Sequence, residues 1–150
     1  MVVVLVAIVG ASVALSLGAR GDRDLETTAE RVLGAINHAA EAAVISGRAY
    51  GLYLTPEACS MVVYDGESWR EAPTGSLGAR LGISPPYALQ GRGVYAVPGR
   101  VPPAPQAIFL PDGDHDLADI AVVNTLSGEA YVLEPALAGR YALTHVAASP

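Results

Sequence analysis

The N-terminal stretch Met1–Leu17, MVVVLVAIVGASVALSL, constrains the fold of this chain more than any other feature. It carries no charge, and its only polar side chains are those of Ser12 and Ser16. At 1.5 Å of rise per residue, a helix of this length spans about 25 Å, whereas a bilayer core needs about 20 residues. The sequence therefore predicts an apolar helix that is slightly shorter than a full membrane span.

Three interpretations of this stretch stay open. The first, which we favour, is a retained membrane helix whose apolar positions include Met1, Val4, Ala7, Gly10, Val13 and Leu17. The second is a cleaved signal peptide, although no basic region precedes the apolar run and residues 16–19 offer only weak cleavage candidates. The third is an apolar helix that is buried within the protein.

Composition limits what the rest of the chain can be. Of 150 residues, about 100 remain after the N-terminal helix, which suits one domain with one core. The net charge is −6, Lys is absent, and the Arg residues are scattered, so the clustered basic footprint of a nucleic-acid-binding protein is missing. Cys59 is the single cysteine and can form neither an intrachain disulfide nor a Cys-based zinc site. We expect no cofactor.

The segment that follows Asp24 has helical periodicity with a narrow apolar stripe. Asp24 is a plausible N-cap and Gly47 a natural C-cap. We predict one long helix from Met1 to about Ser46, with a possible kink near the glycines at 18 and 21. This divides the chain into 1–19 in the membrane, an amphipathic half at 20–46, and a β-rich domain at 47–150. The stripe consists of Leu25, Ala29, Val32, Leu33, Ile36, Ala39, Ala40, Ala43 and Val44.

Downstream of Gly47, short apolar and aromatic runs alternate with turn signals. The first two runs are spaced as a hairpin. One long helix followed by many antiparallel strands is an α+β fold with the helix packed on sheet. The strands are predicted at 48–54, 59–65, a short piece from Trp69, 77–83, 87–89, 94–97, 106–110, 119–124, 129–134 and 140–146.

In this layout the chain resembles the type IV pilin-like proteins, and among them the H-type minor pseudopilins of the type II secretion system. Residues 1–10 resemble the apolar run that follows the conserved Glu of the family. Ser46–Leu52 resembles the end of its helix and its first strand, and Phe109–Gly113 resembles its Phe-x-Pro-x-Gly segment. The pieces Tyr131–Leu133 and Tyr141–Leu143 resemble the terminal strands.

The resemblance implies a non-enzymatic structural subunit. It would be a single-pass protein of the bacterial inner membrane with a periplasmic domain. Its partners would be the other pseudopilins of the pseudopilus tip and shaft, and a secreted exoprotein. The Gly-Phe cleavage site and the Glu of the family are not present in this sequence, and no residue can be given their roles. We therefore expect the reading frame to extend upstream of Met1, which would also complete the membrane span.

The acidic run Asp112–Asp119 is the best candidate for a metal site. Asp112, Asp114 and Asp116 have the D-x-D-x-D spacing of a calcium loop. The match to an EF-hand then fails, because Leu117 and Val123 stand where Gly and Glu are required. We favour a solvated turn between two strands over a calcium site.

Other chemistry-bearing residues give weaker signals. His115 adjoins these carboxylates, but metal sites need several convergent ligands. The histidines have no Ser or Cys arrangement that would suggest a nucleophile with its base. The aromatic residues could form core or a partner-facing patch, and we favour core. They are Tyr50, Tyr53, Tyr64, Trp69 and Tyr87.

The sequence therefore favours a minor pseudopilin that acts in protein secretion across the outer membrane. A type IV pilus minor pilin is a close alternative. A secreted or membrane-tethered β-rich binding module is a second alternative, and it depends on whether Met1–Leu17 is removed. A metal-dependent enzyme built on Asp112–Asp119 is a third.

Overall fold

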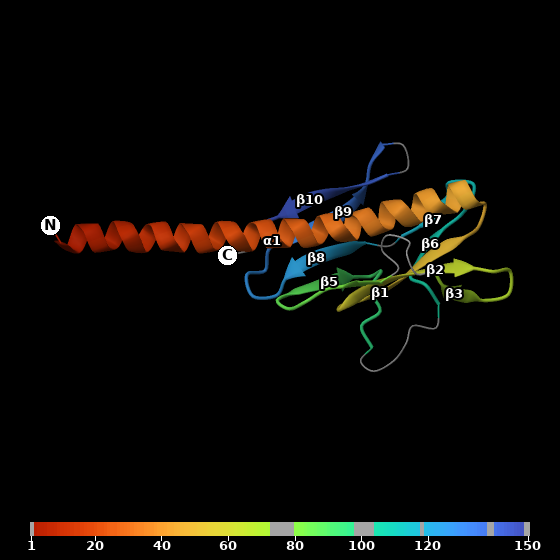
Figure 1. The fold of residues 1–150 in the computed structure, drawn as a ribbon, viewed down its shortest axis with the longest axis horizontal. Helices are drawn as coiled ribbons and strands as arrows, with labels where there is room; N and C mark the ends of the chain where they lie inside the picture. The colour runs from red at the N-terminus through yellow and green to blue at the C-terminus, as the bar shows by residue number, and fades with distance from the viewer. Residues whose placement is uncertain (1, 73–79, 98–103, 118, 138–139, 149–150) are drawn as a thin grey trace.

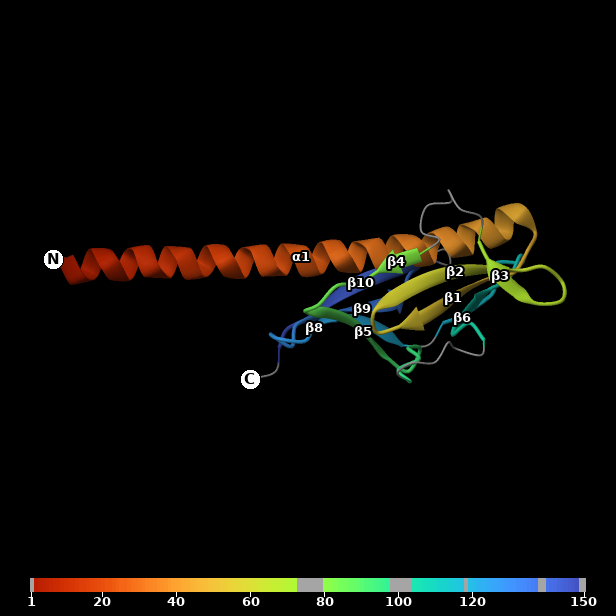
Figure 2. The same ribbon diagram turned by 60° about the horizontal axis from the view of Figure 1, so that its bottom comes forward.

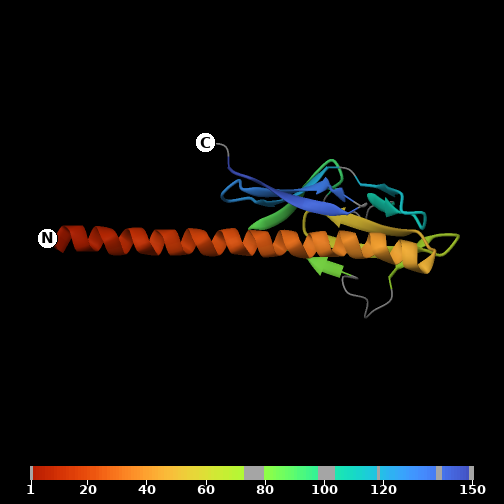
Figure 3. The same cartoon turned by 90° about the horizontal axis from the view of Figure 1, so that it is seen from above.

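In the computed structural model, the C-terminal half of one long helix packs against a β-rich body, and the N-terminal half extends beyond that body (Figure 1). The structure describes residues 2–72, 80–97, 104–117, 119–137 and 140–148, and it describes side chains of the helix from residue 23 onward. Helix α1 runs from Val2 to Ser46 and is drawn as one continuous rod in all three views (Figures 1–3). The helix passes through residues 18–21 without a break.

The strands described form two antiparallel sheets. The first sheet has the order β3-β2-β1-β6-β7, with β4 also paired to β2. It is built from β1 (Tyr50–Thr55), β2 (Ala58–Tyr64), β3 (Trp69–Glu71), β4 (Arg80–Gly82), β6 (Ala107–Phe109) and β7 (His115–Asp116). The second has the order β10-β9-β8-β5, from β5 (Tyr87–Gly91), β8 (Ile120–Asn124), β9 (Ala130–Pro135) and β10 (Tyr141–Val146). Figure 2 shows both sheets beside the same half of the helix.

The core lies where the apolar stripe of α1 meets both sheets. Val32, Ile36 and Ala39 are fully buried, and so are Leu52 of the first sheet and Val122 of the second. Each aliphatic side chain that leaves water in this way contributes about 1.5–3 kcal/mol of favourable free energy. The helix therefore joins two sheets that share one core.

The predicted α+β class, with a helix packed on antiparallel sheet, is confirmed. Every stripe residue from Leu25 to Ala43 is buried or packed against the core, whereas Val44 is 54% exposed. Gly47 ends the helix as predicted, with a φ of 70° and an N–H that donates to the Ala43 carbonyl. Asp24 is not an N-cap, because the helix already runs through it, and its carbonyl accepts a hydrogen bond from the Thr28 hydroxyl.

The first hairpin is confirmed, with Tyr53 opposite Ser60 in the β1–β2 ladder. The strand predicted at 94–97 is wrong: the Tyr95 N–H donates to the Leu54 carbonyl as an isolated contact, and no ladder forms. Of the strand predicted at 77–83, β4 covers Arg80–Gly82, and residues 77–79 lie outside the described residues. The short strand β7 falls inside the acidic run, where only a turn was predicted.

Over the residues with described side chains, no helical segment has the length and apolarity that crossing a bilayer requires. The side chains of Val4, Ala7, Gly10, Val13 and Leu17 lie outside that part of the chain, and Met1 lies outside the described residues altogether. Their assignment to a membrane segment, and the division of the chain at residues 19 and 46, therefore stay predictions.

Candidate functional site

The helix and both sheets meet at a joint formed by three side chains. Asn37, on the helix, accepts a hydrogen bond from the backbone N–H of Tyr141 at 3.3 Å. The Tyr141 hydroxyl lies 2.9 Å from Nδ1 of His115 on β7, and the two rings are 5.1 Å apart. The ring of Phe109 on β6 also lies edge-on to the His115 ring, with the centroids 6.4 Å apart. The joint thus fixes the start of β10 against the helix and against the far edge of the first sheet.

The protonation of the Tyr141 hydroxyl follows from its surroundings. Burial raises the pKa of the Tyr141 phenol, and the nearby Asp116 carboxylate raises it further. Tyr141 therefore keeps its proton at neutral pH. Which of the two groups donates in the contact between the hydroxyl and His115 Nδ1 depends on the tautomer of the imidazole.

Beside this joint, the surface is hollowed into a groove of about 440 Å³. Most of the lining comes from the helix, with Gly113 from the turn after β6 and Arg140 from the residue before β10. The lining carries both signs of charge, from Glu41 and Arg140, together with His38. The full lining is Gly34, Asn37, His38, Ala40, Glu41, Val44, Gly113 and Arg140. This lining, charged and open to solvent, differs from the mostly apolar clefts that bind small molecules.

The acidic run lies at the β6–β7 turn next to the groove. Asp112 accepts the backbone N–H of Asp114 at 2.9 Å, and Asp114 accepts that of His115 at 3.1 Å. Asp116 belongs to β7 and pairs with Ile108. Among the residues that the structure describes, no group of three or more His, Cys, Asp or Glu side chains is placed to hold a metal ion.

The aromatic residues divide between core and surface. Tyr50 and Tyr87 pack against the core, in line with the favoured interpretation. Tyr64 is 38% exposed and stacks on Trp69 at a centroid distance of 5.2 Å. This pair marks the outer end of the β2–β3 hairpin, so it is a surface feature and not part of the core.

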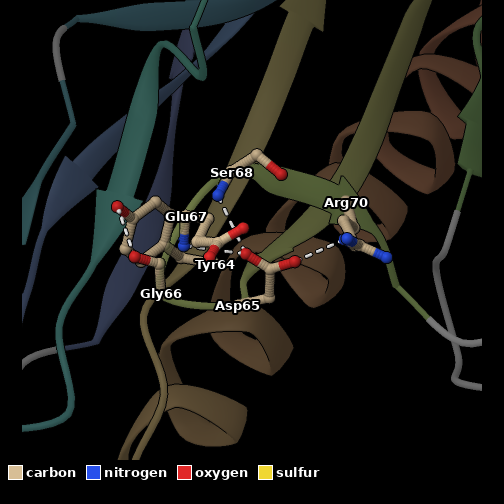
Figure 4. Close-up of polar contacts among 6 residues, drawn as sticks. All are labelled: Tyr64, Asp65, Gly66, Glu67, Ser68 and Arg70. Atoms are coloured by element: carbon tan, nitrogen blue, oxygen red, sulfur yellow. Dashed lines mark hydrogen bonds and ion pairs between the residues drawn. The ribbon is translucent and has the colours of Figure 1, made fainter.

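The turn of that hairpin is fixed by Asp65 (Figure 4). Its carboxylate accepts the backbone N–H groups of Glu67 at 2.9 Å and Ser68 at 2.8 Å, and it forms an ion pair with Arg70. The hydrogen bonds from Ser68 and Glu67 hold the pKa of Asp65 below its usual value, with a smaller contribution from Arg70. Asp65 therefore acts as a turn-stabilising residue.

Cys59 is fully buried in β2, opposite Leu54. Burial raises the pKa of its thiol to about 12. A thiol in that state is a poor nucleophile, since the thiolate is the reactive form. Cys59 thus has a packing role.

The sequence does not predict the joint or the groove. The Asn37–Tyr141 contact joins residues 104 positions apart, and the Tyr141–His115 contact joins residues 26 apart. The only local signal was the polar character of Asn37 and His38 beside the apolar stripe.

In a comparison with solved structures, this architecture is similar to that of minor pseudopilin structures from a type II secretion system. The minor pseudopilin EpsH from the type II secretion system of Vibrio cholerae superposes with a TM-score of 0.64 at 14% identity, over 80% of this chain and 95% of that one. A second EpsH crystal structure gives 0.55 at 12% identity, over 83% and 94%. The solution structure of Escherichia coli GspH gives 0.53 at 20% identity, over 81% and 86%.

These comparisons establish the fold, and the resemblance stated from the sequence agrees with them. No protein-family model and no curated protein matches this sequence. At such low identity, shared activity does not follow from shared fold.

Proposed function

We propose that this chain is a minor pseudopilin, a structural subunit of a type II secretion pseudopilus that helps move folded proteins across the outer membrane. The observation that carries the proposal is the structural similarity to EpsH, which covers 80% of this chain and 95% of that one at a TM-score of 0.64. It has no catalytic role in this account. Its partners are other pseudopilins of the tip and shaft, with the exoprotein as a further contact.

In this proposal, the apolar stretch Met1–Leu17 determines where the protein is located in the cell. Before assembly, this segment anchors the chain in the inner membrane as a single-pass helix, with residues 47–150 in the periplasm. After assembly, it packs in the core of the fibre. A uniformly apolar helix suits both environments, because neither offers water to polar groups. The projection of the helix beyond the β-rich body supports this use (Figure 1).

The test is membrane retention of the full chain in a bacterial host. Ala7→Asp and Val13→Asp each place a charge within the apolar run, at a cost of about 3 kcal/mol at mid-bilayer. We expect both to reduce the carbonate-resistant membrane fraction. Leu126→Asp, at a turn residue that is 85% exposed, is the matched control and should leave fractionation unchanged. Equal membrane retention of all variants would contradict the anchor.

The protein recovered from these membrane fractions also distinguishes a pseudopilin from a secreted β-rich module. Mass spectrometry of the mature N-terminus shows whether residues 1–17 remain. A mature chain that starts after Leu17 would favour the secreted module. Recovery in retractile pili in place of secretion pseudopili would favour the pilus minor pilin.

A further inference from the structure

Among the described residues, the C-terminal part of β1 has no strand beside it on the side where β6 lies. β6 pairs with β1 only at residues 50–52, and Leu52 lies opposite Ala107. Continuing this register would place Pro105 opposite Leu54. Proline has no backbone N–H to donate, so it cannot extend the ladder. The backbone N–H and C=O of Leu54 therefore need other partners, because buried backbone groups are almost always paired.

Leu54 finds these partners near the two ends of the connection between β5 and β6. Its N–H donates to Oε1 of the Gln106 side chain at 2.8 Å. Its carbonyl accepts the N–H of Tyr95, also at 2.8 Å. Leu54 is fully buried, so an unpaired N–H or C=O at this position would be costly. The Gln106 carboxamide thus takes the place of the backbone carbonyl that a neighbouring strand would supply.

The Gln106 side chain is held in one orientation. Its Nε2 donates to the Ala104 carbonyl at 2.7 Å, which leaves Oε1 as the atom that faces Leu54. The preceding residue, Pro105, is buried against β1. A Cβ added to Gly51 would lie 2.7 Å from Cβ and Cγ of Pro105, so the absence of a side chain at Gly51 is what admits the proline. Both contacts keep the carboxamide beside the unpaired end of β1.

These contacts also connect the two sheets. Tyr95 follows β5 of the second sheet, and Gln106 directly precedes β6 of the first. Both segments are fixed on the same residue of β1. The neighbouring residues Ala96, Val97 and Ala104 are exposed. A segment that is held by few buried contacts opens at a lower free energy than the core around it.

We propose that Gln106 is a latch between the two sheets. Its carboxamide pairs the free end of β1 and holds the segments 94–97 and 104–106 against it. Release of the latch opens both segments together, since both are bound to Leu54, and leaves the core shared by the helix and the sheets intact. This inference is independent of the proposed function, because it concerns the chain by itself.

The test is amide hydrogen exchange of the purified full chain in detergent, followed by NMR at several low urea concentrations. In the wild type, the amides of Leu54 and Tyr95 should share one free energy of opening. That value should be lower than the value for Val122, at the centre of the second sheet, and it should depend less on urea because little surface is exposed. Exchange of Leu54 with the same free energy and urea dependence as Val122 would overturn the latch, since opening would then be global.

Gln106→Ala removes the acceptor of the Leu54 N–H. We expect it to speed exchange at Leu54 and Tyr95 by the same factor, about tenfold. Gln90→Ala is the matched control, because Gln90 is an exposed glutamine of β5, and it should leave both rates unchanged. Faster exchange at Leu54 without a change at Tyr95 would overturn the joint opening, and unchanged exchange at Leu54 would overturn the role of Gln106.

Gln106→Glu separates the two hydrogen bonds of the carboxamide. It keeps an oxygen that can accept from the Leu54 N–H and loses the Nε2 donor to Ala104. Exchange at Leu54 should stay closer to the wild-type rate than in Gln106→Ala. Equal acceleration in the two variants would show that the bond to Leu54 is not the contact that holds the latch.

Discussion

The Tyr141 hydroxyl and Nδ1 of His115, 2.9 Å apart, connect the edge strand of one sheet to the edge strand of the other. Tyr141 begins β10 and His115 begins β7, and the two strands share no ladder. Together with the hydrogen bond from the Tyr141 N–H to Asn37, this contact links both sheets to the helix. It therefore bears on any surface that both sheets help to form, including the groove beside Arg140.

Removing the hydroxyl should destabilise the domain without changing its shape. We expect Tyr141→Phe to lower the free energy of unfolding by about 1 kcal/mol, as for a typical buried hydrogen bond. His115→Ala should cost a similar amount. In the double mutant, urea unfolding should reveal a coupling of about 0.5–1.5 kcal/mol, and strict additivity would show that the two groups do not interact.

A matched pair of isoleucines tests the packing of the helix. Ile36 is fully buried in the shared core, and Ile45 is 77% exposed. Ile36→Ala should lower the free energy of unfolding by about 2–5 kcal/mol, because it leaves a cavity between helix and sheets. Ile45→Ala should change it by no more than about 0.5 kcal/mol. Similar losses for the two variants would contradict the observed face of the helix.

The burial of Cys59 predicts a thiol that is silent in the native state. With the pKa raised to about 12, almost none of it is thiolate at pH 8. Iodoacetamide should therefore modify the protein only as it unfolds, at a rate that rises with urea concentration. Rapid labelling in buffer alone would refute the buried position in β2.

The Asp65 turn predicts a specific pH dependence. Its pKa is lower in the folded chain than in the unfolded chain, chiefly because the Ser68 and Glu67 N–H groups stabilise the charged form. The stability it contributes is therefore present above the unfolded pKa, and it is lost as the pH falls through the folded value. Asp65→Asn should be less stable than wild type at pH 7, and the difference should shrink in acid. A difference that is constant from pH 7 to pH 2 would contradict this role.

Much of the fold follows from the sequence because its signals are local. Steps of three and four residues identify the buried face of the helix from Leu25 to Ala43, and Gly47 marks its end. Alternating apolar runs place the β1–β2 hairpin and the last three strands. Each of these features depends on residues that are close together in the chain.

The errors arise where distant residues decide the outcome. Residues 94–97 are apolar enough for a strand, but the Val94 N–H closes a local turn onto the Gly91 carbonyl and the Tyr95 N–H donates to Leu54 as an isolated contact, so no ladder forms. His115 and Asp116 have no strand signal, yet they pair with β6 because the hairpin turn returns them to it. Asp24 has the chemistry of an N-cap, and it fails as one because the helix begins long before it. The joint of Asn37, Tyr141 and His115 is visible only after folding.

We propose that this chain is a subunit of a secretion pseudopilus. The most direct measurement is to shear pseudopili from cells that produce the full chain with the other pseudopilins, and to probe the purified fibres for it. We predict that the chain is recovered in the fibres and that Ala7→Asp removes it, while Leu126→Asp, at an exposed turn, does not. Fibres that form normally and contain none of the wild-type chain would contradict the claim.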